Sequence, residues 1–161
     1  MLKNALNQVI AGENLSLQEA RESMQTIMSG EASESQIGAL LTALRMKGET
    51  CEEIAGFAET MRHHTVKVNC RETNLLDTCG TGGDKKGTFN ISTAVAFVVA
   101  GAGVSVAKHG NHGVSSTSGS ADVLKALGVK IDLAPQAIAN VIDEAQIGFL
   151  YAPVFHPAMK Y

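Results

Sequence analysis

Apolar residues recur at helical spacing through residues 1–65, and this pattern predicts four short amphipathic helices. A hydroxyl residue followed three positions later by Glu or Gln is the signature of a capping box at a helix start. The boxes in this stretch are Ser16 with Glu19, Ser33 with Gln36, and Thr50 with Glu53. Gly30 and Gly48 stand where the second and third helices should end. Short helices gain most of their stability by packing their apolar faces on neighbours, so we predict a small helical lobe.

The pattern changes after residues 66–74, VKVNCRETN, which fit no helix and are predicted to link two lobes. Short apolar runs then alternate with helix-like segments. The predicted strands are 75–77, 104–107, 129–133 and 148–151, and the predicted helices are 92–100, 120–127, 135–144 and 157–161. This alternation indicates parallel strands with helices on their faces. The predicted fold class is therefore α/β, with a small N-terminal helical lobe and a mainly parallel α/β lobe that begins at residue 75.

Two loops in the second lobe, residues 79–90 and 108–118, are rich in glycine and small hydroxyl residues. Each lies between a predicted strand and a predicted helix, the place where such sheets bind ligands. Backbone N–H groups of these loops, together with a helix N-terminus, attract anions. The alternative for either loop alone is a hydrophilic loop that caps a helix without a ligand. Both together favour a ligand with two phosphate ends, and we predict a phosphoribosyl-diphosphate site.

The first loop carries GTGGD at residues 80–84, and its glycines allow a ligand to approach the backbone closely. Asn90, Ser92 and Thr93 open the following helix, so their polar groups are expected to face the same space. Asp84 would repel a bare phosphate, which points to a Mg²⁺ ion or a ligand hydroxyl between them. The hydroxyl of Ser92 is the predicted second contact with that metal.

The second loop reads KHGNHGVSS at residues 108–116. Lys108 offers a positive charge on a flexible stem. Asn111 can donate and accept hydrogen bonds, which suits a residue that orients an acceptor substrate. Ser115, Ser116 and Ser120 precede a predicted helix and can hold a terminal phosphate.

Composition excludes several other functions. The net charge is −3 with no basic stripe, and Trp is absent, so we expect no nucleic-acid partner. The stretch 94–107 is too short and too interrupted by glycine to span a bilayer, so no membrane association is expected. Three cysteines without a C-x-x-C spacing favour a reducing, cytoplasmic location over disulfides or zinc. Cys79 is interpreted as a small buried residue at a strand end rather than a nucleophile.

The segments GTGGD, N-x-S-T, KHGN and S-x-S-G-S-A-D-V-L together resemble the anthranilate phosphoribosyltransferase family. The similarity extends from the helical start to FLYAPVFHPAMKY at the last residue. It implies a helical lobe beside a larger α/β lobe, and a homodimer formed through the helical lobe. It also implies a Mg²⁺-dependent enzyme of tryptophan biosynthesis. This enzyme would transfer a phosphoribosyl group from phosphoribosyl diphosphate to the nitrogen of anthranilate and release diphosphate.

The resemblance also assigns substrate-binding residues in both loops and in the helices that follow them. They are Gly80, Gly83, Asp84, Thr88, Asn90, Ile91, Ser92, Thr93, Lys108, His109, Gly110, Asn111, His112, Gly113, Val114, Ser115, Ser116 and Ser120. Within this set Ser92 would be the Mg²⁺ ligand, and Gly80 and Asn111 would touch anthranilate, with His109 close by. No side chain is expected to act as a nucleophile, because positioning and electrostatics carry the reaction.

Two departures from the family pattern stand out. His112 occupies a position where the family usually has arginine, which would supply more positive charge. The family's chains are also longer, and the remainder carries an Asp-Glu pair for Mg²⁺ and an arginine for the anthranilate carboxylate. Asp143 and Glu144 lie in an amphipathic predicted helix and do not fit that role. We therefore predict a partial chain with an incomplete α/β lobe. The alternatives are a non-catalytic family member that binds without turnover and a nucleoside-phosphorylase-like enzyme.

Overall fold

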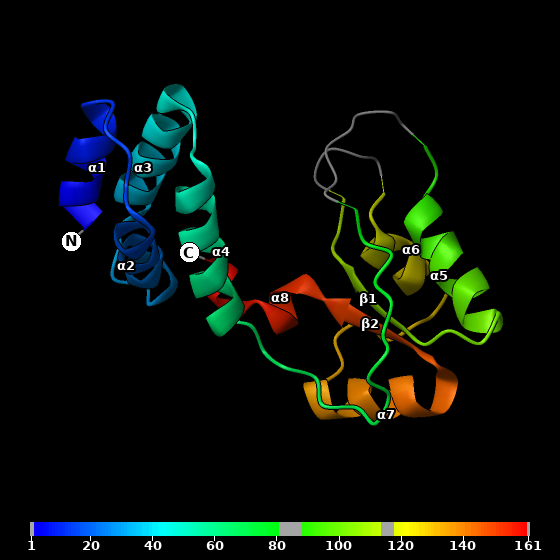
Figure 1. The fold of residues 1–161 in the computed structure, drawn as a ribbon. Coiled ribbons are helices and arrows are strands. Elements are labelled where there is room, and N and C mark those ends of the chain that lie inside the picture. The colour runs from blue at the N-terminus through cyan, green and yellow to red at the C-terminus, as the bar shows by residue number, and fades with distance from the viewer. Residues whose placement is uncertain (1, 81–87, 114–117, 161) are drawn as a thin grey trace. The chain divides into compact units, whose positions relative to one another are not determined.

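The computed structural model describes residues 2–80, 88–113 and 118–160, which form two compact units (Figure 1). One unit consists of Met1–Thr65 with His156–Tyr161, and the other consists of Val66–Phe155. The C-terminal segment belongs to the helical unit because Ala158 packs on its core and His156 lies 3.4 Å from the Thr65 hydroxyl. In the described part of the chain, no helix is long and apolar enough to cross a membrane.

The helical unit contains α1 (Leu2–Ile10), α2 (Leu17–Met28), α3 (Glu34–Lys47), α4 (Cys51–His63) and the 3₁₀ helix η1 (Pro157–Lys160). The three predicted capping boxes are confirmed, because each cap hydroxyl accepts from the backbone three residues on and receives the reciprocal side chain. Gly30 and Gly48 have φ values of 74° and 90°, as expected of glycines that end α2 and α3.

One apolar core joins the four long helices. Its buried members are Leu2, Ala5, Val9, Leu15, Ala20, Met24, Ile27, Met28, Leu40 and Leu44. Helices α2 and α4 make an extensive contact, and Gly56 permits their close approach. A Cβ atom on Gly56 would lie 2.6 Å from the carbonyl oxygen of Leu17 and 2.8 Å from the Cβ of Ala20. Any side chain at this position would therefore push the two helices apart.

A buried carboxylate ties the start of α4 to the segment before α2. Glu53 Oε1 accepts from the N–H of Leu15 at 2.9 Å, and Oε2 accepts from the N–H of Thr50 at 2.7 Å. Oε2 also lies 3.0 Å from the Lys47 ammonium group. Burial by itself raises the pKa of Glu53, but these hydrogen bonds outweigh it and hold the pKa below the usual 4.5. Glu53 is therefore both an ion-pair partner and a helix cap.

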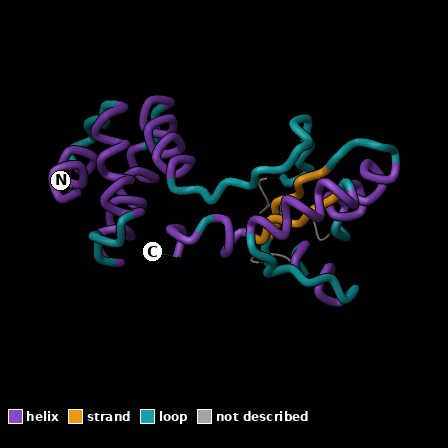
Figure 2. Tube along the Cα trace, turned by 90° about the horizontal axis from the view of Figure 1, so that it is seen from below, coloured by secondary structure: helices purple, strands orange, loops and turns teal. Residues whose placement is uncertain are grey.

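The second unit contains α5 (Ile91–Gly101), β1 (Val106–Gly110), α6 (Ser120–Ala126), α7 (Pro135–Ala145), β2 (Ile147–Tyr151) and α8 (Ala152–Phe155). Strands β1 and β2 are parallel, with Val106 opposite Ile147 and Gly110 opposite Tyr151 (Figure 2). Leu76 adds a single parallel bridge to Val106. The predicted helical lobe and mainly parallel α/β lobe are thus both present.

Side chains of the strands alternate between two faces. Phe149 packs with residues of α6, whereas Leu150 packs with residues of α7. In β1, Ala107 contacts the α7 side, so Lys108 must point to the opposite face, where α5 and α6 lie. This alternation determines where the lysine ammonium group can reach.

Several predicted boundaries are wrong. Residues 129–133 form no strand. Ile131 is buried and Leu133 is half-buried because their side chains pack in the apolar clusters, without strand pairing of the backbone. The predicted strand 75–77 reduces to the bridge at Leu76. The predicted helix 157–161 is a 3₁₀ turn, and α8 was not predicted. The strand predicted at 104–107 runs instead from Val106 to Gly110, because its pairing with β2 continues into the predicted loop.

The Glu53 network leads to a stability prediction. Replacing Glu53 with alanine leaves Lys47 and two backbone N–H groups without their acceptor, and the free energy of unfolding should fall by about 3–5 kcal/mol. The exposed neighbour Glu52, also in the first turn of α4, provides the matched control, and Glu52→Ala should cost less than about 1 kcal/mol. Urea unfolding followed by circular dichroism measures both values, and equal effects would contradict this role.

The same network predicts a pH dependence. Because the folded pKa of Glu53 is lowered, its contribution to stability is complete above pH 4.5 and is lost as the pH falls through the folded pKa. The alanine variant should lack this part of the acid transition.

Candidate functional site

The two predicted loops meet at the ends of neighbouring strand segments, and Asp77 joins them. Its Oδ1 accepts from the N–H of Cys79 at 2.9 Å in the first loop and from the N–H of His109 at 3.2 Å in β1, shortly before the second loop. Its Oδ2 lies 3.2 Å from Nδ1 of the His109 ring. One carboxylate therefore ties the start of the first loop to the strand that leads into the second.

Lys108 lies in β1, with only 2% of its surface exposed. Its Nζ donates to Ser92 Oγ at 3.2 Å and to the carbonyl oxygen of His109 at 3.4 Å. Burial lowers the pKa of Lys108 below the usual 10.5, while the nearby Cys79 and Asp77 raise it in part. The result is a desolvated cation directed at the start of α5, where an anion would be strongly attracted.

The start of α5 is held against both loops. Thr78 Oγ1 donates to the carbonyl oxygen of Ser92 at 2.8 Å. Asn90 is the N-cap residue, but its side chain makes no capping bond. Its Nδ2 instead donates to the carbonyl oxygen of Ser118 at 3.2 Å, across to the second loop. The N–H groups of Ile91 and Thr93 donate to the carbonyl oxygens of Phe89 and Asn90, so the anion-attracting group that the structure places at this helix start is the Lys108 ammonium beside Ser92.

A second carboxylate, Asp122, organises the base of the second loop. Its Oδ2 accepts from the N–H of Gly113 at 3.0 Å and from the N–H of Gly119 at 2.7 Å, and its Oδ1 lies 2.5 Å from His112 Nδ1. The hydrogen bond to His112 and those from the two glycine N–H groups lower the pKa of Asp122 to about 2. The ring of His112 also stacks edge-on against Tyr151, with centroids 5.5 Å apart.

The predicted site residues fall into three groups. Gly80, Thr88, Asn90, Ile91, Ser92 and Thr93 lie in the first loop and the first turn of α5. Lys108, His109 and Gly110 lie in β1, Asn111, His112 and Gly113 follow it directly, and Ser120 opens α6. Gly83, Asp84, Val114, Ser115 and Ser116 lie outside the described residues. The described members thus come together around Lys108 at one end of the strand pair.

Lys108, His109 and Gly110 belong to a strand, and the prediction that they form a loop is wrong. Because β1 continues opposite β2 up to Tyr151, these residues have fixed directions rather than loop freedom. Cys79 also differs from its prediction, since it is an exposed free thiol.

The sequence reasoning assigned no role at this site to Asp77 or Asp122. Both residues accept backbone N–H groups from residues that flank the loops. The sequence signals that could have identified them were the position of Asp77 shortly before Gly80 and the position of Asp122 in the first turn of the helix after the second loop. Acidic residues at such positions are common at ordinary strand and helix ends, so these signals are weak.

The described residues do not by themselves complete a magnesium site. No group of three or more His, Cys, Asp and Glu side chains gathers there in the described part of the chain. Ser92 supplies one hydroxyl oxygen, and that oxygen already accepts from Lys108. Mg²⁺ commonly takes most of its ligands from substrate phosphates and water, so a single protein hydroxyl is compatible with an ion that arrives with its substrate.

Comparison with known proteins now adds to this geometry. Residues 72–161 match the glycosyl transferase family a/b domain, and residues 3–65 match the helical bundle domain of the same family. The chain belongs to the glycosyl transferase family. The resemblance found in the two loops is therefore confirmed across both parts of the chain.

Three similar proteins are informative. An anthranilate phosphoribosyltransferase of Moorella thermoacetica is 58% identical over 161 residues, which is 100% of this chain and 48% of that protein. The crystal structure of anthranilate phosphoribosyltransferase from Thermus thermophilus is 47% identical with a TM-score of 0.88, over 97% of this chain and 47% of that one. The structure of anthranilate phosphoribosyltransferase from Saccharomyces cerevisiae in complex with PRPP and Mg is 27% identical, with a TM-score of 0.87. This match covers 99% of this chain and 48% of the yeast chain. The chain thus spans about half the length of these relatives.

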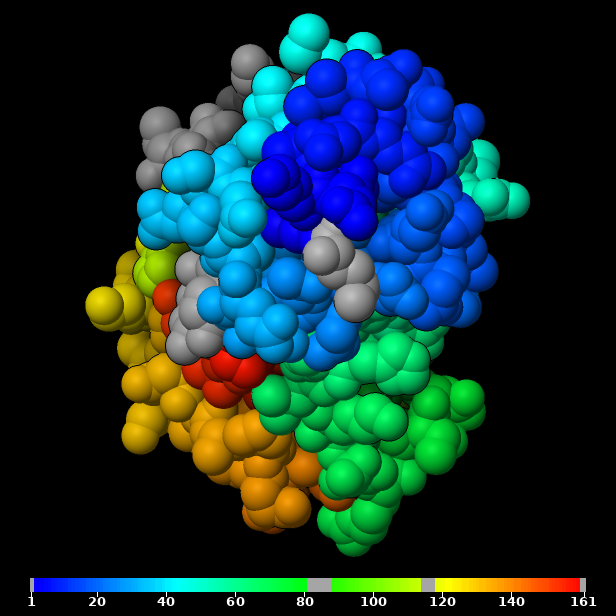
Figure 3. Space-filling view, turned by 90° about the vertical axis from the view of Figure 1, so that its left-hand side faces the viewer, coloured from blue at the N-terminus to red at the C-terminus, as the bar shows by residue number. Residues whose placement is uncertain are grey.

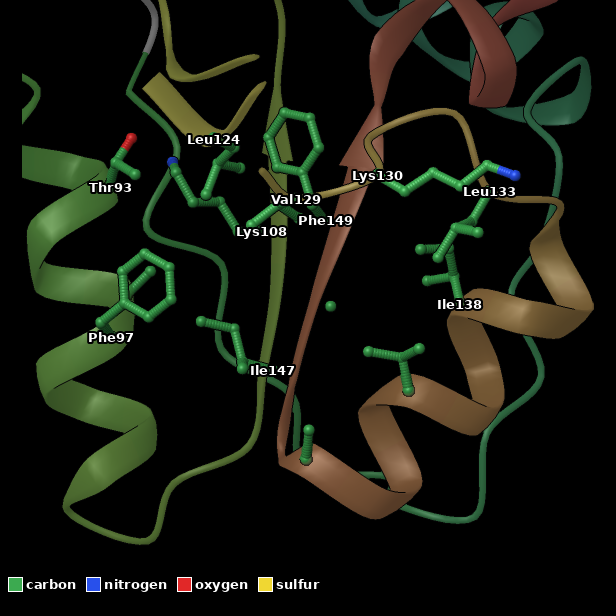
Figure 4. Close-up of a pocket in the computed structure, with 14 residues that line it drawn as sticks. Thr93, Phe97, Lys108, Leu124, Val129, Lys130, Leu133, Ile138, Ile147 and Phe149 are labelled. Atoms are coloured by element: carbon green, nitrogen blue, oxygen red, sulfur yellow. The ribbon is translucent and has the colours of Figure 1, made fainter. Parts of the chain in front are cut away.

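A groove of about 210 Å³ lies beside the second strand, β2 (Figure 4). Its lining comes from both sides of the strand pair. It includes Phe97 of α5, Leu124 of α6, Ile138 and Val141 of α7, and Ile147 and Phe149 of β2. Thr93 and Lys108 lie at the end of the groove nearest the loops, and the buried hydroxyl of Thr93 has no hydrogen-bond partner among the described residues.

The burial of Lys108 leads to a prediction that separates stability from function. Replacing Lys108 with methionine removes a desolvated charge, and the free energy of unfolding should rise by about 1 kcal/mol. Because the folded pKa of this lysine is lowered, wild-type stability should increase as the pH rises through that pKa, and Lys108→Met should lack this increase.

Chemical unfolding between pH 7 and pH 10 measures both effects. Lys67→Met, at an exposed lysine, is the control and should change stability by less than about 0.5 kcal/mol. A Lys108→Met variant that is clearly less stable than wild type would contradict this view of the site.

Proposed function

We propose that this chain supplies the phosphoribosyl-diphosphate-binding half of an anthranilate phosphoribosyltransferase of tryptophan biosynthesis. The reaction transfers a phosphoribosyl group from phosphoribosyl diphosphate to the nitrogen of anthranilate and releases diphosphate. The observation that carries the proposal is the meeting of two glycine-containing loops around the buried Lys108. The relatives named anthranilate phosphoribosyltransferase support this reaction over a nucleoside-phosphorylase-like one.

The chain's own residues suit the binding of a departing diphosphate. The buried Lys108 ammonium lies at the first turn of α5, where it donates to Ser92 Oγ, and the N-terminus of a helix adds positive potential to the same place. Gly80 and Asn111 are proposed to contact anthranilate, with His109 beside it. The Asp77 carboxylate holds the His109 backbone and ring, so this edge of the acceptor site is preorganised.

The chemistry requires no attacking side chain. As the bond from the sugar to diphosphate breaks, positive charge develops on the ribose ring and negative charge develops on the leaving group. Fixed N–H groups and a buried cation stabilise the leaving group without reorganising during the reaction. The remaining requirement is an acceptor nitrogen held close to the sugar carbon and aligned with the breaking bond.

Mg²⁺ is the proposed cofactor, and Ser92 is its proposed ligand from the described residues. When bound, the ion would supply charge neutralisation to the diphosphate. The yeast relative was crystallised with PRPP and Mg, which supports a substrate that brings its metal with it.

The groove beside β2 supports the view that transfer needs additional chain. Gln146 accepts from the N–H of Val106 at 2.9 Å, so the backbone groups of Gly148 and Leu150 face β1. Those of Ile147 and Phe149 then face away from β1, along an edge with no further strand among the described residues. An apolar side chain of α5 that lines the groove, Phe97, stays 46% exposed. A further strand with apolar side chains would cover both the edge and the groove.

This incompleteness supports the second interpretation for the chain in isolation, namely that it binds ligand without turnover. The relatives are about twice as long, so the other half of the site has a natural source.

The helical unit is the proposed dimer interface. Apolar side chains stay exposed on its helices, among them Ile10 on α1, Leu41 and Met46 on α3, and Ile54 on α4. Figure 3 shows α1, α2 and α3, in shades of blue, on the face turned toward the viewer. A second copy that covers such side chains would remove them from water.

The binding residues can be tested in a complete enzyme built by joining this chain to the remaining half of a relative. Lys108→Ala and Ser92→Ala should each reduce kcat/KM for phosphoribosyl diphosphate at least about 100-fold, because each removes a group directed at the diphosphate. Lys67→Ala is the control. Unchanged turnover in both site variants would overturn the assignment.

The chain alone should show little or no transfer. Anthranilate is fluorescent, and its consumption in the presence of phosphoribosyl diphosphate and Mg²⁺ follows the reaction directly. We expect a rate near background for the 161 residues and a measurable rate after addition of the remaining half. Robust transfer by the chain alone would show that its site is already complete.

A further inference from the structure

Asp122 connects the two ends of the second loop. It is the common acceptor for the backbone of Gly113, before residues 114–117, and for the backbone of Gly119, after them. The two donors are close in space, because a Cβ atom on Gly119 would collide with the Gly113 nitrogen and the Asn111 carbonyl oxygen. Only glycine at position 119 allows the backbone to come this close to Gly113. The Asp122 carboxylate then bonds to the N–H groups of both glycines.

The same contact extends to Asn111. Its carbonyl oxygen accepts from the N–H of Ala121 at 3.1 Å, which attaches it to α6. Its Oδ1 accepts from the N–H of His112 at 2.8 Å, and the His112 ring is held by Asp122. The bond to Oδ1 fixes the orientation of the Asn111 amide, whose NH₂ group can donate to a ligand.

A carboxylate beside a phosphate site normally weakens binding by repulsion. Here the charge of Asp122 is matched by two N–H donors on one oxygen and an imidazole on the other. The hydrogen bonds lower the pKa of Asp122 to about 2, so it is ionised and remains an acceptor near neutral pH.

From these contacts we propose that Asp122 is a positioning residue, which holds residues 111–113 and 119–120 in the arrangement that binds phosphoribosyl diphosphate and orients Asn111. The inference rests on the proposed function. Asp122 itself touches no substrate, and its effect is transmitted through Gly113, Gly119 and His112.

The test uses the 161-residue chain and two measurements. Amide hydrogen exchange by NMR reports on Gly113 and Gly119, and calorimetric titration with phosphoribosyl diphosphate and Mg²⁺ reports affinity. In Asp122→Ala, exchange at both glycines should become at least about 10-fold faster and affinity should fall at least about 10-fold. Asp132→Ala, at an exposed carboxylate on the segment before α7, is the control and should change neither.

The conservative variant separates hydrogen bonding from charge. In Asp122→Asn, the amide oxygen can still accept from both glycines and the NH₂ can donate to a neutral His112, so most of the affinity should return. Asp122→Glu keeps the charge but displaces the carboxylate by one methylene, and it should bind more weakly than Asp122→Asn. If Asp122→Ala does not fold, the comparison of Asp122→Asn with Asp122→Glu replaces it. Tighter binding by Asp122→Glu than by Asp122→Asn would overturn the proposal.

The remaining outcomes are also decisive. Unchanged exchange in Asp122→Ala would show that the carboxylate does not hold the loop ends. Faster exchange with unchanged affinity would show that it holds them without positioning the site. Failure of the wild-type chain to bind phosphoribosyl diphosphate would count against the proposed function, and the exchange measurement would still decide whether Asp122 joins Gly113 to Gly119.

Discussion

Burial of the Lys108 ammonium group beside a parallel strand pair is the constraint on which the rest of the site depends. A lysine in this position costs stability unless polar groups surround it, and here they come from α5, from β1 and from the segment that contains Asp77 and Cys79. Asp77 holds the backbone of Cys79 and His109, and Thr78 and Lys108 both bond to Ser92, so the cation and the start of α5 keep a fixed relation. An anion entering this space meets groups already in place, which is the condition for electrostatic stabilisation of a leaving group.

The helical unit and the family were predictable because their signals are local. Capping boxes such as Thr50 with Glu53 depend on residues three positions apart, and the structure reproduces all three. The two glycine-rich loops were recognised from the type and order of their residues, and the same segments carried the resemblance to the family. The burial of Glu53 was harder to predict, because its partner Leu15 is 38 positions away in the sequence. The two residues come into contact only when α4 packs beside the segment before α2.

The rest of the site depends on long-range pairing. Whether Lys108 belongs to a loop or a strand depends on β2, which begins at Ile147, and local pattern does not report that pairing. Asp77 and Asp122 look like ordinary acidic residues at the ends of elements until their carboxylates are seen to meet N–H groups across the loops. The segment 129–133 shows the opposite error. Its alternating apolar and polar residues predicted a strand, but Ile131 is buried there without pairing to another strand.

The central claim is that both loops contact one diphosphate around Lys108, and an NMR titration of the ¹⁵N-labelled chain with Mg²⁺-diphosphate tests it most directly. We expect saturable shifts of the amide signals of Cys79, Gly80, Ser92, His109 and Asn111 with a single dissociation constant, and no shifts in α1–α4. Shifts confined to one loop, separate dissociation constants for the two loops, or shifts concentrated in the helical unit would contradict the claim.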